Sequence, residues 1–543
     1  MPINSIVIEN FQSFVGPVVI PVRPLTFLFG PNSAGKSAVS DALELFQMTF
    51  DVGDLSLNPI LTVPDETSDF VWNGIEKWTR RGTTTDAASG IRLRVAGTAS
   101  FAEAGRFLTN TDDENEALLA LEELYCEVDV SVGYCSATAL GETGNHVTDL
   151  TLYIDSQMAI QLVGSRLTLW NTGIVGLITR RFVDYPIVHG SDVAQVDIDD
   201  VEYSIWRGLH TGNTELNRVL MLLLAILHEF NYRPYVFGLQ RTLADRSTIS
   251  ADDCIDCNLN SGGAISKQLR RSSNRYVREL CQSIRQRRAV AEQQSHMDHS
   301  DEKAIDSIET NSVISDTVFQ QAMVDTLNSY ARIAREDAGV AGSLLDAVNH
   351  GLLDLFADVG YQIVYDLHQV RSRVVKSANI QHQQDGATIG DICQLFLRDT
   401  DGRVFDFVDV GTGISCVIPV LVDLYAPMVF FQQPELHLHP AMQSRLADLF
   451  VERIQRGMPR FFIESHSEYM LIRVLRRVRE TFTGKSVRQN LTIRPDQVAV
   501  LYFQPARDGA TTITEIPINE YGDFFSPWPQ GFFEERARDL FDE

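Results

Sequence analysis

The chain has 543 residues, 44% of them hydrophobic and 22% charged, with a net charge of −26. This composition is typical of a globular protein with several domains, and so acidic a surface should on the whole repel nucleic acid. Seven scattered cysteines argue against a disulfide framework. The apolar run Val219 to Leu227 is too short to span a bilayer. We therefore expect a cytoplasmic protein without membrane partners.

The first fifty residues predict three short strands, a glycine-rich loop and a helix. The strands cover Ser5 to Ile8, Val18 to Val22 and Leu25 to Phe29, and the helix covers Ser37 to Phe50. Between the last strand and the helix, the segment Gly30 to Ser37 fits G-x-x-x-x-G-K-[ST]. In this context the pattern predicts a phosphate-binding loop, and hence a site for ATP and Mg²⁺.

The chemistry of this loop assigns roles to its residues. Backbone N–H groups and the start of the helix bind phosphate oxygens, because both present partial positive charge. Lys36 should reach the β- and γ-phosphates, and the Ser37 hydroxyl should coordinate Mg²⁺. The predicted ATP-binding residues are Gly30, Asn32, Ser33, Ala34, Gly35, Lys36 and Ser37.

The middle of the chain predicts two inserted lobes. Residues 51–261 alternate turns with β-rich segments, and residues 262–386 are mainly helical in pattern, with a mobile polar linker near 293–311. Between Ile265 and Val290 there are eight basic residues and one acid. Three interpretations of that segment stay open: it contacts nucleic acid, it forms a helix face that pairs with an acidic lobe, or it is a solvated face.

A possible zinc site also lies in the middle region. Cys254 and Cys257 form a C-x-x-C pair, and His296 and His299 follow about forty residues later. The gap is long for a zinc finger, so two reduced surface thiols are the simpler interpretation.

Alternating strands and helices resume near residue 387, so residues 1–50 and 387–543 together predict one α/β core. The apolar segment Pro427 to Phe431 reads as a strand and ends at Gln432-Gln433. In P-loop ATPases the first of these positions normally carries the acid that holds Mg²⁺, and the second a residue that positions the attacking water. Gln432 is therefore the predicted metal-site residue and Gln433 a predicted catalytic one. Neither amide carries charge, which predicts slow or absent hydrolysis.

A second helix and strand follow this pair. The helix is predicted from Met442 to Ile454 and the strand from Arg460 to Glu464, with Ser465-His466-Ser467 at its carboxyl end. Ligands collect at that end of parallel strands. His466 is therefore predicted to hydrogen-bond a γ-phosphate or its water.

A second glycine-rich segment precedes a helix predicted over Cys416 to Tyr425. Gly411, Gly413 and Ser415 stand at its start and form a second predicted anion-binding site. One nucleotide does not need two such sites from one subunit. A head-to-tail dimer would use both, with each subunit presenting this segment to the partner's γ-phosphate.

Taken together, these motifs resemble the ABC-type ATPase heads of the SMC, RecF and OLD group. The resemblance rests on FGPNSAGKS, VGTGIS, QQPELHLHP and ESHSEYML, and on the ending WPQGFF. It implies an α/β head assembled from both chain ends and a dimer that closes on two ATP·Mg²⁺. Gln432 departs from the group, where Asp or Glu is usual. It is either an introduced change that traps ATP or natural degeneration.

The resemblance also suggests a role. OLD-type nucleases carry an acidic metal-binding domain after the ATPase, and no such cluster stands out here. The arrangement is similar to the ATPase subunits of Septu-type anti-phage systems, including retron-linked ones. There an ATPase restrains a separate HNH nuclease, and the retron-linked systems add a reverse transcriptase with its nucleic acid.

Two other functions remain open on the sequence. The chain could be a DNA-repair or chromosome-maintenance ATPase that clamps DNA, with basic residues from 265–290 and from Arg473, Arg476, Arg477 and Arg479. It could also be a nucleotide-gated scaffold that never hydrolyses ATP.

Overall fold

The structure is a computed structural model. It describes residues 3–51, 91–99, 124–135, 144–154, 156–163, 166–170, 193–197, 235–237, 248–249, 344–371, 388–407, 409–426, 428–457, 459–485, 490–507 and 509–525. The chain divides into two compact units. The first comprises Met1–Val236, Arg460–His466 and Arg494–Glu543, and the second comprises Phe237–Pro459 and Ser467–Ile493.

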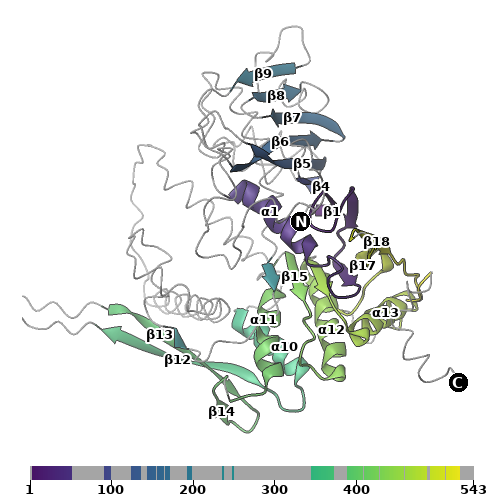
Figure 1. The fold of residues 1–543 in the computed structure, drawn as a ribbon. Helices are drawn as coiled ribbons and strands as arrows, with labels where there is room; N and C mark the ends of the chain where they lie inside the picture. Colours follow the sequence, from purple (N-terminus) through teal and green to yellow (C-terminus); the bar gives the residue numbers. More distant parts are fainter. Residues whose placement is uncertain are drawn as a thin grey trace, which may run out of the picture. The chain divides into compact units, whose positions relative to one another are not determined.

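An eight-stranded antiparallel sheet forms much of the first unit (Figure 1). Its order is β2-β1-β4-β5-β6-β7-β8-β9. The strands are β1 (Ile3–Glu9), β2 (Val18–Pro21), β4 (Ile91–Ala99), β5 (Leu124–Cys135), β6 (Gly144–Ile154), β7 (Gln157–Val163), β8 (Arg166–Trp170) and β9 (Val193–Asp197). Buried Asp129 accepts hydrogen bonds from Arg92 and Arg94, so this inward-facing charge is paired.

The first unit also holds a mainly parallel core sheet built from both ends of the chain. Strands β3 (Leu25–Phe29), β16 (Arg460–Glu464), β17 (Val498–Pro505) and β18 (Thr511–Glu515) lie in the order β16-β3-β17-β18. Strand β3 pairs in parallel with both β16 and β17, whereas β18 pairs antiparallel with β17. All residues of β3 are buried. Continuous apolar runs such as these are typical of central parallel strands. The predicted α/β class and its assembly from both ends are confirmed.

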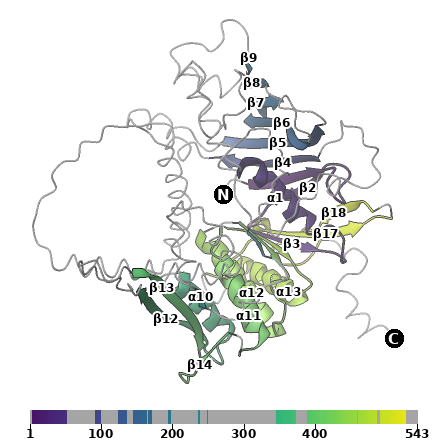
Figure 2. The same ribbon diagram turned by 60° about the vertical axis from the view of Figure 1, so that its left-hand side comes forward.

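The second unit is a group of helices with a small sheet (Figure 2). Its helices are α10 (Leu344–Leu355), α11 (Thr412–Asp423), α12 (Pro440–Gly457) and α13 (Glu468–Phe482). Strands β11 (Thr248–Ile249), β12 (Gln362–Arg371), β13 (Thr388–Arg398) and β14 (Val404–Phe405) form the sheet, and β15 (Met428–Gln432) is also in this unit. Buried residues such as Leu352, Ile418 and Phe450 form its core.

Three elements complete the description: α1 (Ala38–Asp51), β10 (Tyr235–Phe237) and the short 3₁₀ helix η3 (Pro495–Gln497). Strands β1, β2, β3, β15 and β16 and helix α1 match their predicted ranges closely. No helix in the described ranges is both long and apolar enough to cross a bilayer.

Two helix starts differ from the predictions. Helix α11 begins at Thr412 and not at Cys416, because Gly411 in an extended conformation caps it and the glycine-rich segment forms its first turn. Helix α12 begins at Pro440 and not at Met442. Proline suits a first helical position, where its fixed φ fits and its missing N–H is not needed.

Several predicted features lie outside the described residues. They are the basic segment 265–290, the linker near 293–311, the Cys254/Cys257 and His296/His299 pairs and the end of the C-terminal tail. The four-part domain division also stays a prediction.

Candidate nucleotide-binding site

The predicted phosphate-binding loop connects β3 to α1 in the first unit. Gly30, Ser33 and Gly35 all have positive φ angles, of 144°, 62° and 84°. A Cβ on Gly30 would lie 2.4 Å from the Phe503 carbonyl oxygen of β17. Only glycine fits there, because a side chain would overlap the backbone of the neighbouring strand.

Two segments that are distant in the sequence contact the loop and hold it in place. Thr511, the first residue of β18, donates its N–H to Ser13 O at 2.8 Å and its hydroxyl to Ala34 O at 3.1 Å. A Cβ on Gly35 would lie 2.3 Å from Ser13 Oγ and 3.3 Å from Thr511 Oγ1. The turn after β1 and the start of β18 therefore fix the loop conformation.

Lys36 is the charged centre of this site. Its side chain is 3% exposed, and its ammonium group donates to Gly30 O at 3.1 Å and Pro31 O at 2.9 Å. The same nitrogen lies 3.5 Å from a carboxylate oxygen of Glu464, at the end of β16. Burial lowers the pKa of Lys36, and the nearby Glu464 charge opposes that shift. The ammonium is thus held at the loop with one carboxylate beside it.

A second acid lies close to this pair. Asp41, in the first turn of α1, accepts a 2.7 Å hydrogen bond from Gln12 Nε2. Burial raises the pKa of Asp41 to about 6, the Gln12 hydrogen bond opposes this, and the charge of Glu464 adds to it. Burial likewise raises the pKa of Glu464, against the effect of Lys36. Gln12 has a positive φ of 48°, so the turn that presents it is constrained.

His466 follows Glu464 by two residues and is exposed. The pKa of His466 is lowered mainly by partial burial of the imidazole and to a smaller extent by the Lys36 charge. A neutral imidazole can either donate or accept a hydrogen bond. The structure thus brings Lys36, Glu464 and His466 together within the first unit, while the predicted role of His466 stays a prediction.

The other predicted site residues lie in the second unit. Half-buried Gln432 ends β15, and Gln433 has a positive φ of 47°. A Cβ on Gly413 would lie 2.7 Å from His437 O, so the first turn of α11 packs closely on the loop after Gln433. Ser467 Oγ donates to Gln443 Oε1 at 2.6 Å, which ties the start of α13 to α12. The second glycine-rich segment and the glutamine pair are therefore neighbours within one unit.

Ser415 has a different environment from the one predicted. It is 7% exposed, and its hydroxyl donates to Phe407 O at 3.1 Å. Gly411, in contrast, is exposed at the helix start. Contact of Ser415 with a partner's phosphate would require its hydroxyl to leave this hydrogen bond, and that contact stays a prediction.

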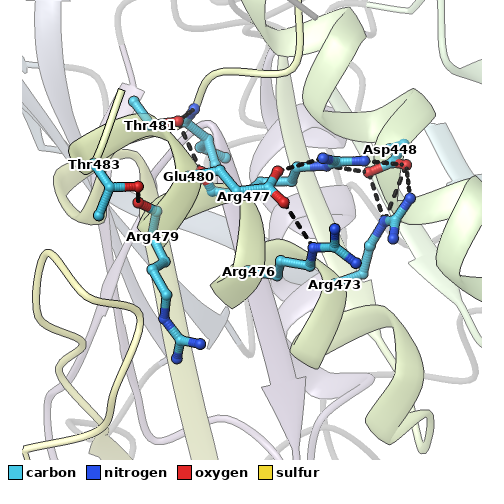
Figure 3. Close-up of polar contacts among 9 residues, drawn as sticks. Asp448, Arg473, Arg476, Arg477, Arg479, Glu480, Thr481 and Thr483 are labelled. Atoms are coloured by element: carbon cyan, nitrogen blue, oxygen red, sulfur yellow. Dashed lines mark hydrogen bonds and ion pairs between the residues drawn. The ribbon is translucent and has the colours of Figure 1, made fainter. Parts of the chain in front are cut away.

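Three arginines of α13, Arg473, Arg476 and Arg477, form ion pairs within their own unit (Figure 3). Arg473 and Arg477 both donate to Asp448 of α12, with shortest distances of 2.6 Å and 2.8 Å. Arg476 and Arg477 also pair with Glu480. Arg473 and Arg477 therefore join α12 to α13, and the two carboxylates offset part of the charge of the arginine run.

The described residues fit a nucleotide better than they fit a free metal ion. No group of three or more His, Cys, Asp or Glu in the described ranges could hold a metal. Mg²⁺ commonly keeps several waters and takes one or two protein ligands together with substrate phosphates. The exposed Ser37 hydroxyl at the start of α1 could serve as such a ligand. Binding of Mg²⁺ together with a nucleotide would therefore not need an acidic cluster here.

Three contributors were not predicted from the sequence. Glu464 could have been suspected, because an acid at the carboxyl end of a parallel strand faces the ligand edge. Asp41 gave a weaker signal, one helical turn after Ser37. Thr511 gave none, since its contact with Ala34 joins residues 477 positions apart.

Two family profiles match parts of the chain. Residues 277–472 match the family described as "AAA domain, putative AbiEii toxin, Type IV TA system". Residues 493–542 match "Protein of unknown function (DUF3696)". The first match includes the second glycine-rich segment, the glutamine pair and His466. Together with the loop at Gly30 to Ser37, it supports an ABC-type P-loop ATPase head that binds nucleotide.

No curated protein matches this sequence. Among solved structures, the chain is similar to an Smc head domain bound to the C-terminal domain of ScpA from Pyrococcus furiosus, at 12% identity and TM-score 0.37, covering 99% of each chain. The SMC head domain from Thermotoga maritima gives 9% identity and TM-score 0.33, covering 95% of this chain and 100% of that one. Similarity at this level carries no functional argument.

Proposed function

We propose that this protein is the ATP-binding regulatory ATPase subunit of a bacterial anti-phage defence complex. ATP and Mg²⁺ would close two copies head-to-tail, and the closed dimer would restrain a separate nuclease, of HNH type. A retron-linked complex would add a reverse transcriptase and its nucleic acid. Loss of nucleotide or a phage signal would release the nuclease.

The observation that carries the ATP-binding part is the environment of Lys36. Its side chain is 3% exposed, yet its ammonium lies beside the positions where backbone N–H groups would bind phosphate. Burying an ammonium is costly even when a carboxylate lies 3.5 Å from it, so this loop keeps a charged group ready for an anionic ligand at the expense of stability. A structural turn would not need such an arrangement.

Two observations support the regulatory part. The matching AAA family is described as containing a putative toxin of a toxin–antitoxin system, which favours a defence role. We assign the nuclease chemistry to a partner, and within the described ranges no group of three or more His, Cys, Asp or Glu could hold a metal ion. The DNA-clamp alternative loses part of its support, because Arg473, Arg476 and Arg477 are paired with Asp448 and Glu480.

Native mass spectrometry of the protein purified from its own cells tests the proposal. The expected species is a dimer or larger assembly that carries ATP together with a nuclease subunit. The Lys36→Ala variant should lose the nucleotide and the closed assembly together. A partner-free dimer that acquires DNA only in the presence of ATP would contradict the defence role and favour the clamp.

A further inference from the structure

One carboxylate in the first unit has no role in the scheme above. Glu464 is the last residue of β16, and in the parallel register it lies opposite Leu28, two residues before the loop begins at Gly30. Its side chain is 15% exposed, and Oε1 lies 3.5 Å from Lys36 Nζ. The strand pairing therefore fixes this carboxylate at the edge of the sheet where the phosphate-binding loop begins.

The position matters because the expected acids are absent. Gln432 and Gln433 stand where P-loop ATPases usually carry charged groups, and an amide cannot accept a proton from water at neutral pH. Lys36 is the residue predicted to contact the β- and γ-phosphates. A carboxylate within ion-pair distance of Lys36 is thus close to where the terminal phosphate would bind.

We propose that Glu464 is the catalytic carboxylate for ATP hydrolysis in this protein. The inference rests on the proposed ATP-binding function and extends it. In the reaction, a Glu464 oxygen holds the attacking water and accepts one of its protons as the water oxygen forms a bond to the γ-phosphorus. The bond from the γ-phosphorus to the bridging oxygen breaks, and ADP leaves with that electron pair. Glu464 then returns the proton to solvent or to inorganic phosphate.

The surroundings of Glu464 suit this role. Without nucleotide, the carboxylate is paired with Lys36. When phosphate oxygens take up the positive charge of Lys36, the carboxylate loses its main counter-ion and becomes a better proton acceptor. Burial acts in the same direction, since it raises the pKa of Glu464. Partial burial and the Lys36 charge both lower the pKa of His466, two residues later, which disfavours an imidazolium as a second counter-ion.

The test compares Glu464→Gln with the wild-type chain in two assays. Equilibrium binding of a fluorescent ATP analogue with Mg²⁺ gives the affinity, and rapid-quench single-turnover hydrolysis gives the chemical step. We expect hydrolysis to fall by about 100-fold or more, as for loss of a general base, while ATP affinity stays the same or increases. The affinity should not fall, because Lys36 loses a competing anion. Glu520→Gln, which removes an exposed carboxylate in the same unit, is the matched control and should leave both values unchanged.

Each other outcome has a defined meaning. If Glu464→Gln loses affinity and hydrolysis in parallel, the residue merely positions Lys36 and the proposal is overturned. Unchanged hydrolysis in Glu464→Gln overturns it as well, as does a wild-type chain that binds ATP but shows no single turnover. In those cases ATP binding stands. Failure of the wild-type chain to bind ATP would instead refute the proposed function itself.

Discussion

Replacing Gly35 by alanine tests how the phosphate-binding loop is held. Gly35 has φ of 84°, and an added Cβ would lie 2.3 Å from Ser13 Oγ, far inside ordinary van der Waals contact at 3.4–4 Å. The left-handed conformation costs alanine about 1–2 kcal/mol, and the overlap adds about 1–3 kcal/mol. Because the overlap displaces the loop, ATP affinity should fall by about 30-fold or more, since about 2 kcal/mol is lost. Titration with a fluorescent ATP analogue measures this.

Two further variants separate conformational strain from overlap. Gly509 has nearly the same φ, 80°, but nothing lies within 4 Å of its added Cβ, so Gly509→Ala should lower stability slightly and leave ATP affinity unchanged. Ser13 Oγ is buried and has no hydrogen-bond partner among the described residues, so Ser13→Ala alone should cost little. In the double variant Ser13→Ala/Gly35→Ala the closest Ser13 atom becomes Cβ, at 3.5 Å. The ATP affinity of the double variant should then be about 5-fold or more higher than that of Gly35→Ala. A double variant that binds as poorly as Gly35→Ala would refute this explanation.

Three other predictions concern single side chains. Asp448→Ala leaves Arg473 and Arg477 without their shared carboxylate and should lower the free energy of unfolding by about 3 kcal/mol, seen as a lower Tm, whereas exposed Asp496→Ala should not. Burial raises the pKa of Asp41 from 3.8, its value in the unfolded chain, to about 6. The folded state therefore binds this proton more tightly than the unfolded chain does. The resulting stabilisation is fully present below pH 3.8 and is lost as pH rises through about 6. In Asp41→Asn, Tm should therefore fall less between pH 3.8 and pH 6 than it does in the wild-type chain. An unchanged slope of Tm against pH would contradict the raised pKa of Asp41. Gln432→Glu should raise hydrolysis at limiting Mg²⁺ by about tenfold if this position contacts the metal through water, and no change would exclude that role.

The fold of the ATPase core could be predicted well because its signals are local. The apolar run Leu25 to Phe29, the glycine pattern after it and the helical spacing that follows are contiguous in the sequence. Strand β16 was predictable for the same reason, since Arg460 to Glu464 is apolar at its centre and precedes a polar turn. The start of α11 was predicted too late, because the two glycines suggested a loop although only Gly411 lies outside the helix.

The contacts that hold the candidate site in place could not be predicted, because they join residues far apart in the sequence. Thr511 reaches Ala34, and Glu464 reaches Lys36, only after β18 and β16 have joined a sheet with the N-terminal strand β3. The arginines of α13 illustrate the converse error. As a sequence run they suggested a nucleic-acid contact, whereas Asp448 on the neighbouring helix pairs with two of them. Charge in a sequence does not reveal which charges will be neutralised in the fold.

The most direct test of the central claim is the affinity of the chain for ATP·Mg²⁺ with and without the Lys36 ammonium. An equilibrium titration should compare the wild-type chain, Lys36→Ala and Lys485→Ala, where Lys485 is exposed on the surface. We predict that Lys36→Ala weakens binding by about 10- to 150-fold, the value of one hydrogen bond to a charged group, and that Lys485→Ala changes nothing. Equal affinities for the wild-type chain and Lys36→Ala would contradict the assignment of this loop as the nucleotide site.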